Sequence, residues 1–175
     1  MPHNGNLLEY SPRRLIFNQK SEIMKKEYEK IRKKFDLPDF EVLNTEFEII
    51  TIEPDGFLLR EIKRKINERL SSACEMLTKM IQPETTSLVD LYEYRCFDDA
   101  AKKQIFELFS RIMYLKRKIN ESELLLDSEK DAAIIKEAAE TWPKLRKQMI
   151  PFVKELEICW ETTPESDKEL KEYLG

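Results

Sequence analysis

Apolar residues recur at helical spacing over most of the chain. The clearest run steps by three or four positions, at Leu59, Ile62, Ile66, Leu70, Ala73, Leu77 and Met80. Its mean step of 3.5 residues is the period of a helix-bundle seam. Similar stripes cover 105–119 and 134–159. We therefore predict three long helices, over 57–81, 98–126 and 128–160.

Prolines and capping residues mark where these helices bend or begin. Pro143 and Pro151 interrupt the last stripe, and each removes a helical hydrogen bond. Because the stripe continues through both, we expect kinks rather than a change of direction. Ser87 followed by Asp90, and Ser128 followed by Asp131, resemble capping boxes that start a short helix and the last long helix.

The first third of the chain shows two further patterns. Ile23, Met24, Tyr28, Ile31 and Phe35 predict a helix that ends before Pro38. β-Branched and aromatic residues alternate with acidic ones around 46–52, which favours a short strand. Asn44 and Thr45 are candidates for the turn of a hairpin between 40–43 and 46–52. A strand without a hairpin partner and an irregular connection are the alternatives.

Together these elements predict a mainly α fold, a bundle of three or four long antiparallel helices with a small β element near 40–52. The length suits a single helical domain over 1–175. Within it we expect five segments: a loose arm at 1–12, a basic helix at 13–35, an acidic connection at 36–56, the long-helix bundle at 57–160 and a tail at 161–175.

Composition excludes several classes of protein. With three glycines and one histidine, the chain has no phosphate-binding glycine loop and little material for a Ser-His-Asp site. The three cysteines show neither metal-ligand spacing nor a disulfide framework, so we expect a reducing, cytoplasmic setting. We expect no membrane span, no secretory signal, no cofactor and no metal.

Charge is unevenly distributed. Residues 13–34 hold nine bases and three acids, whereas 35–55 hold seven acids and no base. Lysines and arginines can drive nucleic-acid binding by releasing counterions from phosphates. The candidate residues are Arg13, Arg14, Lys25, Lys26, Arg32, Lys33 and Lys34. Alternatively, the two segments neutralise each other within or between chains, which the net charge of -4 favours.

Two catalytic alternatives involve helix-borne charges. The chain resembles the all-helical nucleotide pyrophosphohydrolases in size, and these enzymes hold magnesium with a Glu-x-x-Glu and a Glu-x-x-Asp motif. Glu137 and Glu140 match the first motif, but no Glu-x-x-Asp partner follows. Arg60, Arg69, Arg111 and Lys118 are candidates for a cationic site of the helical chorismate-mutase kind. A cavity holding two or more Arg, Lys or Glu side chains would favour such a small bundle enzyme.

The favoured function is a non-catalytic helical interaction or scaffold protein. Because Phe106, Phe109 and Met113 widen one apolar stripe, we expect self-association, as a homodimer, or a protein partner. A nucleic-acid-associated accessory protein that uses the basic helix is the alternative, and a small helical-bundle enzyme is the second alternative. No membrane partner is expected.

Overall fold

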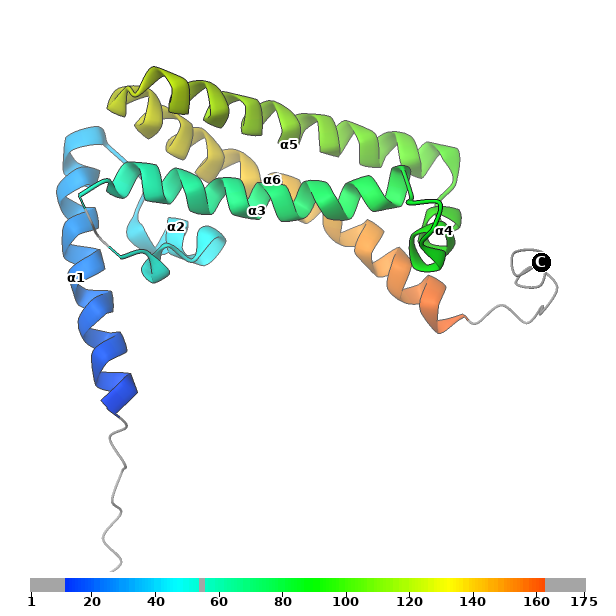
Figure 1. Cartoon of the computed structure of the whole chain (residues 1–175), viewed down its shortest axis with the longest axis horizontal. Coiled ribbons are helices and arrows are strands. Elements are labelled where there is room, and N and C mark those ends of the chain that lie inside the picture. Colours follow the sequence, from blue (N-terminus) through cyan, green and yellow to red (C-terminus); the bar gives the residue numbers. More distant parts are fainter. Residues whose placement is uncertain (1–11, 54–55, 163–175) are drawn as a thin grey trace, which may run out of the picture. The chain divides into compact units, whose positions relative to one another are not determined.

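The protein is mainly helical. A computed structural model describes residues 12–53 and 56–162, with backbone only for 12–18. Within these residues the elements are α1 (Pro12–Phe35), α2 (Phe40–Phe47), the 3-10 turn η1 (Ile49–Thr51), α3 (Leu58–Ile81), α4 (Leu88–Arg95), α5 (Asp99–Leu125) and α6 (Ser128–Glu161), and they include no strand (Figure 1).

The three predicted long helices are confirmed as α3, α5 and α6. α6 continues through Pro143 and Pro151 without a break, as the uninterrupted apolar stripe predicted. The predicted cap at Ser87 is also confirmed, because its hydroxyl accepts a hydrogen bond from the backbone N–H of Asp90 at 3.2 Å. Asp98 likewise accepts from the N–H of Ala101 at 2.7 Å and caps α5.

The predicted β element near 40–52 is wrong, because this segment forms α2 and η1. Phe40, Leu43 and Phe47 are spaced by three and four residues and are all buried on one helical face. That burial outweighs the β-branched composition of a short segment. The chain then turns at Glu48, whose φ is 54°, and the side chain of Asn44 accepts a hydrogen bond from the N–H of Ile50 at 3.0 Å.

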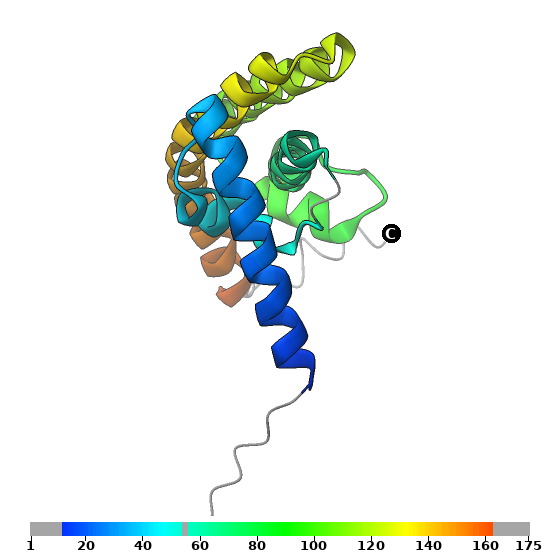
Figure 2. The ribbon, with the colours of Figure 1, turned by 90° about the vertical axis from the view of Figure 1, so that its left-hand side faces the viewer.

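The helices divide into two compact units, and each long helix contributes residues to both. The first unit contains the described residues up to Asn67 together with 119–139, and the second contains 68–118 with the described residues from Glu140 onward. In the first unit α2 lies beside the C-terminal part of α1 (Figures 1 and 2). Its fully buried core includes Met24, Tyr28, Leu43, Ile49, Ile62, Ile66 and Ile135.

The second unit is closed by contacts between α4 and the end of α6. Cys96 and Cys159 form a disulfide with a Cα–Cα distance of 6.1 Å, within the usual range for a disulfide. The hydroxyl of Tyr92 donates to the carbonyl of Cys159 at 2.8 Å, and the indole of Trp160 donates to Glu93 at 3.1 Å. The expectation that the chain has no disulfide is therefore wrong. The two cysteines are 63 residues apart, so their spacing carries no short-range signal.

None of the described helices is both long enough and apolar enough to cross a membrane.

Candidate functional site

The basic helix α1 is paired with the acidic segment that follows it. Lys20 Nζ lies 2.6 Å from Glu53 Oε1, and Lys25 Nζ lies 2.7 Å from Glu41 Oε1. The ammonium of Lys25 also lies 5.2 Å from the centre of the Phe40 ring. These contacts confirm that the two oppositely charged segments neutralise each other, at least in part, within one chain.

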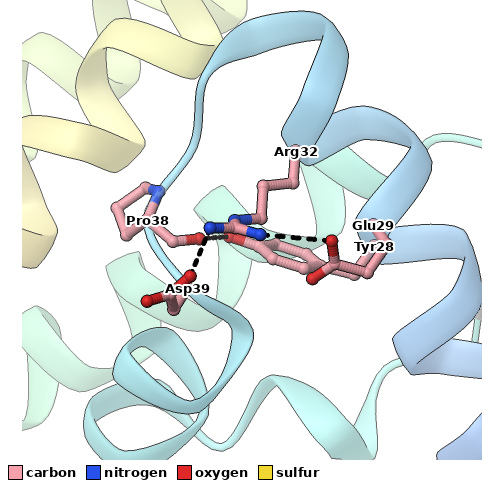
Figure 3. Close-up of polar contacts among 5 residues, drawn as sticks. All are labelled: Tyr28, Glu29, Arg32, Pro38 and Asp39. Carbon is pink, nitrogen blue, oxygen red and sulfur yellow. Dashed lines mark hydrogen bonds and ion pairs between the residues drawn. The ribbon is translucent and has the colours of Figure 1, made fainter.

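Arg32 makes the most extensive of these pairings (Figure 3). Its guanidinium bridges Glu29, at 3.2 Å from Nη1 to Oε2, and Asp39, just before α2. Beside it the buried Tyr28 donates a hydrogen bond to the carbonyl of Pro38 at 2.6 Å. Hydrogen bonding to Glu29 raises the pKa of Arg32, and burial raises the pKa of Tyr28. Both side chains thus fasten the joint between α1 and α2.

The residues predicted to bind nucleic acid are therefore in different situations. Lys25 and Arg32 are held by carboxylates, whereas Lys26 and Lys33 are exposed and form no ion pair with a described residue. Lys34 lines a cavity of the first unit. Arg13 and Arg14 belong to the first turn of α1, and their side chains lie outside the described part of the chain. Binding of nucleic acid by these residues stays a prediction.

A cavity of about 690 Å³ lies in the first unit, where four helices end or begin. The last turn of α1 contributes Lys34, the first turns of α3 contribute Arg60 and Lys63, the end of α5 contributes Ser122, and the first turn of α6 contributes Asp131. The volume falls in the range of ligand-binding pockets, roughly 300–1,000 Å³. The cavity is thus large enough for a peptide side chain with its neighbours or for a small molecule.

Lys63 forms a buried ion pair in the lining of this cavity. Its side chain is 2% exposed, and its Nζ lies 2.6 Å from Asp131 Oδ1 and donates a hydrogen bond to Ser122 Oγ at 2.9 Å. Ser122 in turn donates to the carbonyl of Ile119 at 2.8 Å. A buried ammonium is tolerated only when it is paired and hydrogen-bonded, so these contacts fix α3, α5 and α6 against one another in the first unit.

The outer part of the cavity has cations that are not neutralised. Lys34 and Arg60 form no ion pair with a described residue, and each lies near an aromatic ring, Phe35 at 4.8 Å and Phe57 at 5.2 Å respectively. Glu123 also lines the cavity and forms no ion pair within the described part of the chain. Because Lys63 is balanced by Asp131, the described lining residues Lys34, Arg60 and Glu123 leave a net charge of one positive unit.

The rim of the cavity is apolar and exposed. Phe57 is 60% exposed and Leu126 is 74% exposed, next to Leu125 and Leu124 at the end of α5. Leu126 has a φ of 52°, in the left-handed region that ordinarily favours glycine at this position after a helix. Its N–H donates to the carbonyl of Ser122 at 3.2 Å, which closes the last turn of α5. Asp127, rather than the predicted Ser128, then caps α6 by accepting from the N–H of Glu129 at 2.9 Å.

The other charged candidates do not converge. Of the four cations considered for a catalytic cavity, Arg60 lines this one, and the other three lie in the second unit. There Arg69 and Arg111 are exposed, Arg111 donates to Gln148 at 2.9 Å, and Lys118 lies 5.6 Å from the centre of the Tyr114 ring. The described residues contain no cluster of three acidic, histidine or cysteine side chains that would hold a metal, and this includes Glu137 and Glu140.

Sequence reasoning missed the ion pair at the centre of the cavity. Lys63 lies four residues after Leu59 and three before Ile66, and Ser122 lies three residues after Ile119, so both polar residues fall within the apolar stripes. A polar residue at such a position is the signal that would have identified them. No protein-family model, curated protein or solved structure matches the chain.

Proposed function

We propose that this protein is a non-catalytic helical interaction protein, and that the cavity of the first unit receives an acidic side chain of a protein partner. The observation that carries this proposal is that Lys34 and Arg60 line the cavity without an ion pair to a described residue, whereas the third cation of the lining, Lys63, is already paired with Asp131. A carboxylate that enters the cavity is attracted by both cations and displaces no ion pair among the described residues.

The arrangement of Lys63 favours binding over catalysis. A cavity with several charged side chains is what the small-enzyme alternative requires, and this observation keeps it as the second candidate. A catalytic amine, however, has to reach its substrate, whereas Lys63 is 2% exposed, is paired with Asp131 and donates a hydrogen bond to Ser122. Lys63 therefore acts as a structural support for the site.

The proposal includes an antiparallel arrangement of the long helices and self-association of the protein. The two residues between α5 and α6 form a joint too short for anything but neighbouring helices, which supports antiparallel packing. Phe106 is 57% exposed and stacks at 6.2 Å on Phe109, which supports a self-associating face on α5. Light scattering on the purified chain tests this part: a dimeric mass supports it, and a monomeric mass at micromolar concentration removes it.

The binding site is tested by nuclear magnetic resonance titration of the full chain with N-acetylglutamate amide. Its side-chain carboxylate imitates a glutamate in a partner, and N-acetylglutamine amide is the matched neutral probe. We expect saturable shifts of the amide signals of Lys34, Arg60 and Glu123 with the glutamate probe alone. Equal shifts with both probes, or shifts spread over the surface, would refute the site.

A further inference from the structure

The rim residue Leu126 combines two unfavourable features. Its backbone is in the left-handed region, with a φ of 52°, where a side chain with a Cβ atom is strained. Its side chain is 74% exposed, so packing within the described part of the chain does little to compensate. Glycine or asparagine at this position would relieve the strain. A strained and exposed leucine at the edge of a cavity points to a use for the side chain outside the folded chain.

Leu126 does not stand alone. Phe57, at 60% exposure, lines the same cavity from the segment that leads into α3, and the two residues place apolar surface beside the cations Lys34 and Arg60. A ligand that fits this arrangement carries a negative charge next to bulky apolar groups. Resting on the proposed function, we infer that the cavity recognises a peptide segment of a partner protein in which a glutamate or aspartate adjoins leucine or phenylalanine.

The charges around the rim favour a protein partner over a membrane. Exposed leucines near lysine and arginine are also typical of membrane-surface binding. Here, however, Glu121, Glu123 and Glu129 are exposed on both sides of the three leucines. Insertion of the leucines into an anionic bilayer would bring these carboxylates against lipid phosphates, which is repulsive. A peptide with a single carboxylate can avoid them.

The inference is tested with a library of amidated peptides whose variable positions carry Leu, Phe, Glu, Gln, Lys or Ser. The full-length protein should enrich peptides that contain both Glu and an adjoining Leu or Phe. The decisive variant is Leu126→Gly, which we expect to raise the midpoint of urea unfolding while it weakens binding of the enriched peptides. The expected loss of peptide affinity is about tenfold, because the variant no longer buries the apolar surface of one leucine on binding. Leu124→Ser is the matched control, because Leu124 is 85% exposed and does not line the cavity.

The outcomes separate this inference from the proposed function. Enrichment of Glu without Leu or Phe, unaffected by Leu126→Gly but lost with Arg60→Ser, would overturn the inference and leave the proposed function standing. Absence of any Glu enrichment would overturn both. Equal losses with Leu126→Gly and Leu124→Ser, or binding of anionic phosphatidylserine vesicles in place of the peptides, would also overturn the inference.

Discussion

Replacing Lys63 by methionine should strongly destabilise the first unit. The change removes the ammonium that pairs with Asp131 at 2.6 Å and donates to Ser122 at 2.9 Å, and it keeps most of the side-chain volume. Asp131 is 14% exposed, so its carboxylate would be left largely buried without its partner. Removing one member of a buried pair costs about 3–5 kcal/mol, and the partial exposure of Asp131 places the cost near the lower end, at about 3 kcal/mol.

Urea unfolding followed by circular dichroism measures this cost. With a slope of roughly 2 kcal/mol per molar urea, the midpoint should fall by roughly 1.5 M. Combining Lys63→Met with Asp131→Leu should recover most of the loss, because replacing a whole buried pair by apolar side chains is often nearly neutral. Lys26→Met is the control at an exposed position and should change stability by less than about 0.5 kcal/mol. A Lys63→Met midpoint that matches this control would refute the buried-pair account.

Three further outcomes follow from the contacts. The Lys20 hydrogen bond lowers the pKa of Glu53 below its ordinary value of 4.5, so the pair stabilises the fold at neutral pH and this stabilisation is lost as pH falls through the lowered pKa. A carboxyl titration by nuclear magnetic resonance should show that pKa rising in Lys20→Ala, and an unchanged value would contradict the pairing. Replacing Cys96 and Cys159 by serine should lower the free energy of unfolding by about 4 kcal/mol, from the loop that the disulfide closes. Equal urea midpoints for this variant and the oxidised protein would show that the bond is not formed. Burial raises the pKa of the Cys74 thiol, so iodoacetamide should modify it only after urea is added, and rapid modification of the folded protein would contradict its burial.

The long helices could be predicted because their apolar residues repeat many times. Each stripe in α3, α5 and α6 gives several independent matches to the helical period, so single exceptions such as Pro143 and Pro151 do not obscure it. The segment 40–52 is too short for this. There Phe40, Leu43 and Phe47 give only three matches to the helical period, and the neighbouring β-branched residues favour a strand. The segment forms a helix because that places all three of these residues on one buried face.

The candidate site was less accessible to sequence reasoning. Opposite charges on neighbouring segments were enough to predict that α1 and the acidic segment pair, since Lys25 and Glu41 are close in sequence. The cavity instead brings Lys63, Ser122 and Asp131 together from three helices. Which residues of different helices meet depends on how the helices pack, and the apolar pattern of a single helix does not determine this. The disulfide between Cys96 and Cys159 depends on tertiary structure in the same way.

The most direct test of the central claim compares Arg60→Ser with Arg64→Ser in the titration with N-acetylglutamate amide. Both arginines are exposed on α3, but Arg60 lines the cavity, whereas Arg64 pairs with Glu61 on the surface and does not line it. If the cavity receives a carboxylate, Arg60→Ser should abolish the shifts at Lys34 and Glu123, and Arg64→Ser should leave them unchanged. Equal responses of the two variants would contradict the claim.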